Sequence, residues 1–131
     1  MYCLDTNILI FDLKSINQDL SRKVEKGILE GQIVLTSITW SEFLYYPHKH
    51  NSEKILNFRK EILLQFPVLD FDSKAAELFA FHKDYLEKIG RKIEEFDLMI
   101  ASICLANDLT LITHNLKHFQ NIEGLKVEDW F

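Results

Sequence analysis

The chain opens with Met1-Tyr2-Cys3-Leu4-Asp5-Thr6-Asn7, a short apolar run followed at once by an acid, a hydroxyl and an amide. The apolar run is typical of a buried strand, and the Ile8-Leu9-Ile10 run that follows predicts a helix starting near Asn7. In parallel α/β sheets, ligands bind where the strands end at their carboxyl side. The stretch therefore predicts that Asp5 lies in a functional cleft, although Asp5 or Thr6 could instead only cap the helix.

Short apolar segments alternate with helical patterns along the rest of the chain. Further strands are expected at 32–36, 67–70, 110–112 and 125–127, and helices at 17–30, 37–46, 52–64, 73–89 and 96–107. The helix at 96–107 is apolar on nearly every side, which predicts a buried central position. Strands alternating with helices imply right-handed βαβ units. We therefore expect an α/β fold, a three-layer α/β/α sandwich around a central, mostly parallel sheet of four or five strands.

The helix after the second expected strand carries signals at both ends. Ser37 or Thr39 is expected to cap its start, and Pro47 is expected to end it after Tyr46 because proline lacks a backbone N–H. Thr39-Trp40-Ser41-Glu42 also matches the capping box, in which Glu42 would bond back to the start of its own helix.

The composition favours one compact domain over residues 1–131. Hydrophobic residues make up 47% of the chain, and only four Gly and two Pro are present. No apolar stretch approaches the roughly 20 residues that span a bilayer. Residues 1–5 also lack the positive start of a secretory signal, so we expect a cytoplasmic protein without membrane contact. Cys3 and Cys104 lie in apolar segments and are expected to be reduced core residues.

The net charge of −5 argues against a general basic coat for nucleic acid, because such binding rests on Lys and Arg against phosphates. Basic clusters remain at Lys49-His50, Arg59-Lys60 and Arg91-Lys92. They could form a rim around an acidic centre, or they could simply be solvated helix faces.

Four polar residues are expected at the same edge of the sheet: Asp5, Glu42, Asp97 and Asn115. Each has a local explanation as a helix cap, a first-turn acid or a turn residue, but these explanations do not account for the shared edge. Carboxylates gathered in a cleft repel one another unless a cation holds them, and oxygen ligands suit Mg²⁺ or Mn²⁺. Such an ion activates water and stabilises charge on a phosphoryl oxygen, which is the chemistry of phosphodiester hydrolysis.

The segments around these residues resemble the PIN-domain family, and within it the VapC-type ribonuclease toxins of toxin–antitoxin pairs. The resemblance runs along the whole chain, through Leu4–Asn7, Ser41–Leu44, Phe96–Ala101, Leu111–Phe119 and Leu125–Trp130. It implies a single PIN domain that cuts RNA as a metal-dependent endoribonuclease. The family often has Asp where this chain has Asn115, which argues against a tightly bound second metal. Toxin relatives often carry Asn where this chain has Phe96.

The resemblance also implies a role for each site residue. Asp5 and Asp97 would bind Mg²⁺ or Mn²⁺, Glu42 would complete the acidic trio by binding through water or placing the nucleophile, and Asn115 would orient water or a phosphate oxygen. Supporting hydroxyls would come from Thr6 and Thr113. Apart from the resemblance, Arg91 and Lys92, just before Asp97, are possible contacts for RNA phosphates or only an exposed loop, and His118 is a possible RNA contact as a rim residue or a stacking partner for a base. The expected partners are RNA, a second copy of the chain and a cognate antitoxin that occupies the acidic groove.

Other functions fit the residues less well. A zinc site at His114 and His118 lacks further ligands at matching spacing. A haloacid-dehalogenase-like phosphatase would need an acid at the position of Asn7, and a receiver domain would need an acidic pair after the first strand. The main alternative is a PIN module without catalytic activity that binds protein or RNA.

Overall fold

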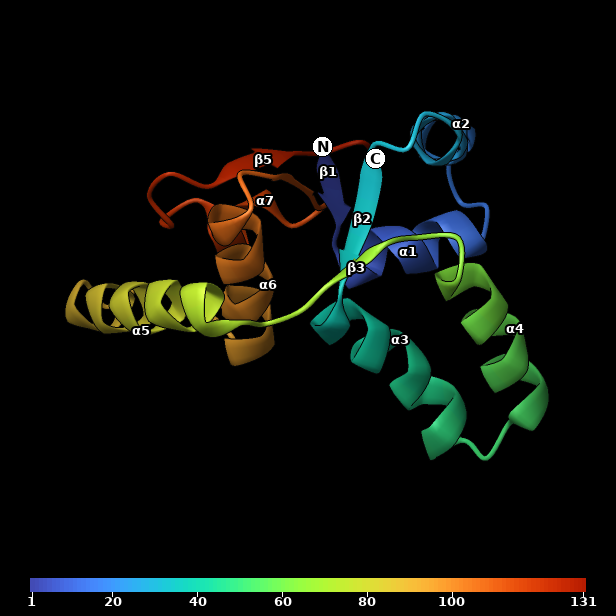
Figure 1. Cartoon of the computed structure of the whole chain (residues 1–131), viewed down its shortest axis with the longest axis horizontal. Coiled ribbons are helices and arrows are strands. Elements are labelled where there is room, and N and C mark those ends of the chain that lie inside the picture. Colours follow the sequence, from blue (N-terminus) through green and yellow to red (C-terminus); the bar gives the residue numbers. More distant parts are fainter.

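The computed structural model describes residues 1–131 as a five-stranded parallel sheet covered by helices (Figure 1). The strands lie in the order β3-β2-β1-β4-β5, and every neighbouring pair is parallel. This confirms the expected three-layer α/β/α sandwich. Along the chain the elements are β1 (Tyr2–Leu4), α1 (Thr6–Leu13), α2 (Gln18–Leu29), β2 (Ile33–Thr36), α3 (Ser37–Lys49), α4 (Glu53–Leu63), β3 (Val68–Leu69), α5 (Ser73–Lys88), α6 (Glu95–Ala106), β4 (Thr110–Ile112), α7 (Leu116–Phe119) and β5 (Lys126–Glu128).

The central strand β1 separates two hydrophobic cores, because successive side chains of a strand point to opposite faces. Cys3 packs in one core with α6, whereas Leu4 packs in the other with α1, α2 and α3. Figure 1 shows α5 and α6 on one side of the strands and α1, α2 and α4 on the other. The sheet is therefore covered on both faces, and its functional residues emerge at the strand ends.

Helix α6 is the buried central helix that the sequence predicts. Ile100, Ile103 and Cys104 are fully buried in it. Cys3 and Cys104 are both free and buried, as expected, and a hydrogen bond with Cys104 together with burial raises the pKa of the Cys3 thiol. None of the helices combines the length and the apolar character that a membrane span requires.

Helix α3 differs from the sequence prediction at both ends. Thr36 caps it, since its hydroxyl accepts a hydrogen bond of 3.0 Å from the Thr39 N–H. The expected cap at Ser37 or Thr39 is therefore wrong. The helix also continues through Pro47 to Lys49 instead of ending at Tyr46.

Arg59 of α4 explains why α3 tolerates this proline. Pro47 leaves the carbonyl of Phe43 without its helical donor. Arg59 replaces that donor, because its Nη1 lies 2.7 Å from the Phe43 carbonyl oxygen. The guanidinium is buried, 4.5 Å from the ring centre of Phe43 and 5.2 Å from that of Tyr46. Arg59 therefore fastens α4 to α3 and does not belong to a basic rim.

Candidate active site

Asp5 lies directly after the central strand, at the point where β1 passes into α1. Its N–H donates to the carbonyl oxygen of Ile112 at 2.9 Å, which extends the pairing of β1 with β4. The carboxylate is almost fully buried. One oxygen accepts from the Thr6 N–H at 2.8 Å, and the other accepts from the Thr113 hydroxyl at 2.9 Å. Asp5 thus both caps α1, as its local sequence suggests, and faces the end of the sheet.

Glu42 reaches the same place from α3. Its Oε1 accepts a hydrogen bond of 2.8 Å from the Thr6 hydroxyl, and Thr6 is the residue whose N–H bonds to Asp5. The capping-box interpretation of Glu42 is wrong, because the side chain bonds across to α1 and not to the start of its own helix. A sequence motif of four residues cannot show whether its glutamate has a more distant partner.

Asp97 in the first turn of α6 meets the short helix α7. Its Oδ2 lies 3.3 Å from Nδ1 of His118, and that nitrogen lies 2.8 Å from the side-chain amide of Asn115. Because an imidazole nitrogen either donates or accepts, it serves one of these two neighbours at a time. The backbone N–H of Asn115 in turn donates to the Thr113 hydroxyl at 3.0 Å.

These contacts form one continuous chain of polar groups, which we call the acidic network. The four predicted residues and both predicted hydroxyls belong to it, although β1, α3, α6 and the turn after β4 are far apart in sequence. Its members, in order of contact, are Glu42, Thr6, Asp5, Thr113, Asn115, His118 and Asp97. The fold therefore brings together what the sequence predicts to lie at one edge.

The network holds its carboxylates in an unfavourable environment. Burial raises the pKa of Asp5, of Glu42 and of Asp97 above the ordinary value. Hydrogen bonds from Thr113, Thr6 and His118, respectively, partly offset this effect. The negative charge of Asp97 adds to the rise in pKa at both other acids, so the three carboxylates lie close enough to repel one another.

No lysine or arginine compensates these charges. The ion pairs of the protein include none between a carboxylate of the trio and Lys or Arg, and Asp97 has only His118. No three acidic, histidine or cysteine side chains surround one point closely enough to hold an ion by themselves. The donor set still fits Mg²⁺, which proteins bind through one or two carboxylates while water fills the remaining positions. Of the two histidines considered for zinc, His114 pairs with Asp129 at 3.0 Å and His118 contacts Asp97.

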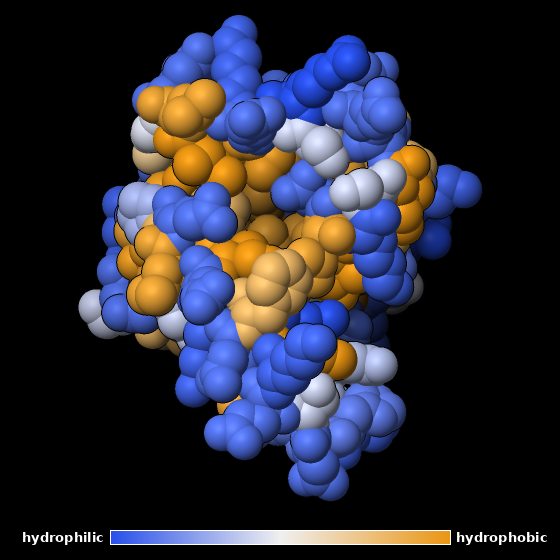
Figure 2. Space-filling view, turned by 90° about the vertical axis from the view of Figure 1, so that its right-hand side faces the viewer, coloured by the Kyte–Doolittle hydropathy of each residue, from blue (hydrophilic) through white to orange (hydrophobic).

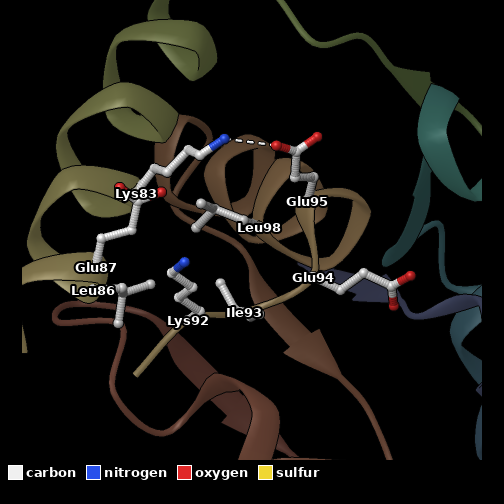
Figure 3. Close-up of a pocket in the computed structure, with 8 residues that line it drawn as sticks. All are labelled: Lys83, Leu86, Glu87, Lys92, Ile93, Glu94, Glu95 and Leu98. Carbon is white, nitrogen blue, oxygen red and sulfur yellow. Dashed lines mark hydrogen bonds and ion pairs between the residues drawn. The ribbon is translucent and has the colours of Figure 1, made fainter. Parts of the chain in front are cut away.

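Glu94 is a neighbour of the site that the sequence did not single out. It precedes α6, and its charge raises the pKa of both Glu42 and Asp97. Figure 3 shows its side chain extending away from Lys92, on the side of the loop opposite to Lys83. Its position at the N-cap of α6, three residues before Asp97, was the available signal.

One of the predicted RNA contacts, His118, belongs to the acidic network, and the other two lie in a neighbouring loop. Arg91 and Lys92 belong to the exposed loop between α5 and α6, and together with His118 they line a hollow next to Asp97. Lys92 also borders the groove between α5 and α6 that Figure 3 draws. Phe96, which precedes Asp97 in α6, is half exposed.

Comparison with known proteins agrees with this fold and this site. The PIN domain family model matches residues 2–125. The chain therefore belongs to the PIN-domain family.

Within that family the similar proteins are VapC ribonucleases. The chain is 32% identical to the tRNA(fMet)-specific endonuclease VapC of Shigella flexneri over 98% of this chain and 97% of that one. It is 29% identical to ribonuclease VapC2 of Rickettsia felis over 99% and 98% of the two chains.

Solved structures with a similar fold include VapBC complexes. DNA-bound VapBC from Salmonella typhimurium superposes with a TM-score of 0.91 at 28% identity, over 99% of this chain and 98% of that one. VapBC2 from Rickettsia felis, bound to a DNA fragment from its promoter, gives a TM-score of 0.90 at 28% identity over the same shares.

Proposed function

We propose that this protein is a Mg²⁺- or Mn²⁺-dependent endoribonuclease and the toxin of a toxin–antitoxin pair. The observation that carries the proposal is the acidic network: three carboxylates repel one another in a partly buried site without a lysine or arginine to compensate them. Such an arrangement costs stability, and a divalent cation removes that cost. The relatives named as VapC ribonucleases support the same activity.

Asp5 and Asp97 would hold the ion, with Glu42 bound directly or through water. When bound, the ion supplies activated water and stabilises negative charge on the phosphoryl oxygens. The hydroxyls of Thr113 and Thr6 fix the orientation of Asp5 and Glu42 through the 2.9 Å and 2.8 Å contacts. The side-chain amide of Asn115 lies 2.8 Å from Nδ1 of His118 and would orient water or a phosphate oxygen.

Isothermal titration with Mn²⁺ separates this function from the alternative of a non-catalytic binding module. We expect Mn²⁺ to bind the wild-type chain, and Asp97→Asn to weaken that binding strongly because the ion loses a charged ligand. A chain that binds neither Mn²⁺ nor Mg²⁺ would favour the binding module.

RNA cleavage tests the activity itself. We propose that the substrate is RNA, and the relative from Shigella flexneri makes tRNA(fMet) the first candidate. Purified protein with Mn²⁺ is expected to cut tRNA(fMet) or another species in total RNA at defined positions, and a chelator such as EDTA should stop the reaction. Intact RNA at all protein concentrations, with Mn²⁺ bound, would contradict the proposal.

The proposed partners are an antitoxin and a second copy of the chain. Solved relatives are toxin–antitoxin complexes, which supports an antitoxin for this protein. Figure 2 shows apolar surface on the side of the molecule formed by α1, α2 and α4. Exposed apolar side chains also occur on α5, where Phe81 is 65% exposed. Two apolar faces suit two partners. Analytical ultracentrifugation of the isolated chain tests the homodimer. We further propose a cytoplasmic location.

A further inference from the structure

The hollow that Arg91, Lys92 and His118 line adjoins the acidic network, and we call it the basic hollow. Its volume is about 240 Å³, and Ile93 is the one hydrophobic residue in its lining. The polar side chains in that lining include Arg91, Lys92, Lys117, His118, Gln120 and Asn121. The net negative charge of the whole chain does not predict such a site.

Two segments far apart in sequence build the basic hollow. Gly90, with φ +68°, ends α5 in a conformation that favours glycine, and the Arg91 N–H then closes the turn on the Leu86 carbonyl oxygen at 2.9 Å. The loop that follows carries two cations, and the neighbourhood of α7 supplies Lys117. The basic hollow is therefore a product of the tertiary fold and not of a run of basic residues.

The cations of the basic hollow have no partner in the protein. Arg91, Lys92 and Lys117 form no ion pair, whereas Lys83 and Lys88 nearby pair with Glu95 and Asp84 at 2.6 and 2.7 Å. One carboxylate, that of Glu94, lines the basic hollow, and its charge also acts on the acidic network. Cations gathered in a concave site and left unpaired create a positive potential that attracts an anion.

His118 joins the basic hollow to the acidic network. It lines the hollow, and its Nδ1 lies 3.3 Å from Oδ2 of Asp97. An anion in the hollow would thus lie next to any phosphodiester that reaches Asp97. Because the carboxylates repel phosphates, a nearby group of cations offsets a barrier that the site itself creates.

We propose that the basic hollow binds a backbone phosphate of the RNA strand adjacent to the phosphodiester that is cut. This proposal rests on the proposed function, since it takes RNA as the substrate. Arg91 and Lys117 would contact the phosphate, and the amides of Gln120 and Asn121 would hydrogen-bond to the same nucleotide. The basic hollow would therefore position the RNA strand and would not take part in cleavage of the phosphodiester.

The lining favours a nucleic acid over an acidic peptide. Peptides and protein segments bind stably by burying apolar side chains, and the basic hollow offers only Ile93 for that purpose. A phosphate requires only cations and hydrogen-bond donors, which is what the hollow provides.

The test compares two double charge reversals. Arg91→Glu/Lys117→Glu removes the cations of the hollow, and Lys54→Glu/Lys60→Glu makes the same change in net charge at exposed, unpaired positions of α4. Cleavage of tRNA(fMet) is measured as kcat and KM. RNA binding is measured by fluorescence anisotropy at several salt concentrations, in an Asp97→Asn background that does not cut.

We expect the reversal in the hollow to raise KM about tenfold or more, because it removes charge-assisted hydrogen bonds to phosphate, and to leave kcat nearly unchanged. The dependence of log affinity on log salt should become shallower by about 0.7 for each phosphate that the variant no longer neutralises. The control pair should change KM less than twofold. This pattern would support a phosphate subsite.

Three results would overturn the proposal: an unchanged KM and salt slope, an equal reduction in RNA affinity in both variants, or a defect confined to binding of a protein partner. Failure of the proposed function looks different. In that case the wild-type chain does not cut RNA, while anisotropy still shows whether binding depends on Arg91 and Lys117. A wild-type chain that binds no RNA at all would contradict both the proposed function and the phosphate subsite.

Discussion

The protein buries charge in two places, and they differ in how that charge is compensated. Arg59 lies among uncharged groups that suit a guanidinium, because it donates to the Phe43 carbonyl and contacts two aromatic rings. Asp5 and Asp97, by contrast, are partly buried near a third carboxylate, and no lysine or arginine pairs with them. The first arrangement supplies a hydrogen bond that α3 lacks, although burial lowers the pKa of the guanidinium, whereas the second costs stability until a cation is supplied.

The difference separates structural from functional charge. Arg59 is explained by the fold, because its Nη1 donates to the carbonyl that Pro47 leaves free, even though its Nε is buried without a partner. A cluster of like charges without a compensating cation points to a ligand from outside. Substitutions in the acidic network should therefore lower RNA cleavage and spare the fold, whereas substitution of Arg59 should lower stability and spare cleavage. The largest effect is expected at the acidic network.

Asp97→Asn and Asp5→Asn should each lower RNA cleavage by at least about a thousandfold, because each removes a charged ligand of the ion at almost constant side-chain volume. Single-turnover assays with Mn²⁺ measure the loss. Circular dichroism should show an unchanged fold, since neither change creates a cavity. Full activity of a well-folded Asp97→Asn protein would remove Asp97 from the mechanism.

Arg59→Met should act on the fold and leave the chemistry intact. The change keeps the apolar stem but leaves the Phe43 carbonyl buried without a donor, so we expect a loss of about 2 kcal/mol in the free energy of unfolding. Urea denaturation measures it, and Lys60→Met, at the exposed next position, serves as the control. Cleavage per folded molecule should equal that of the wild type.

A double-mutant cycle with Pro47→Ala sharpens this result. Alanine restores an N–H that bonds to the Phe43 carbonyl inside α3. Arg59→Met should therefore cost less in the Pro47→Ala background than in the wild type. Equal costs in both backgrounds would show that Arg59 acts through its ring contacts and not through the carbonyl.

The sequence predicted most of the fold because strand and helix periods are local signals. It placed the strands and the buried helix α6 within a few residues, and it predicted that Asp5, Glu42, Asp97 and Asn115 lie at one edge of the sheet. It failed where a distant partner decides the outcome. A proline normally ends a helix. Helix α3 continues through Pro47 because Arg59, twelve residues further on, supplies a donor to the Phe43 carbonyl. Glu42 likewise matches a local motif but bonds to Thr6.

Thr113→Val should reduce cleavage by about tenfold. The Thr113 hydroxyl donates to Asp5 and accepts from the Asn115 N–H, so its loss loosens two members of the acidic network together. Thr113→Ser keeps the hydroxyl and should restore most of the activity. Parallel kcat measurements and thermal melts separate misplacement of Asp5 from simple loss of stability, which would affect both variants alike.

The smallest effect concerns stability and pH. Burial raises the pKa of Asp97 in the folded protein above its ordinary value of 3.8. An acid whose pKa is raised on folding destabilises the protein at pH values above the folded pKa, and this penalty disappears as the pH falls to the unfolded value. In metal-free buffer at neutral pH, Asp97→Asn should therefore be more stable than the wild type, by less than about 1 kcal/mol.

The gain should shrink as the pH is lowered from neutrality towards 3.8, because the wild-type carboxylate then takes up a proton and no longer repels its neighbours. Added Mn²⁺ at neutral pH should reverse the ranking, since the ion binds and stabilises only the protein that retains its ligands. Thermal unfolding in EDTA and in Mn²⁺ measures both shifts. An Asp97→Asn protein that is less stable than the wild type in EDTA would contradict this expectation. It would mean that His118 compensates the charge of Asp97 as fully as the Phe43 carbonyl and the two rings compensate that of Arg59. The contrast between the two sites would then fail.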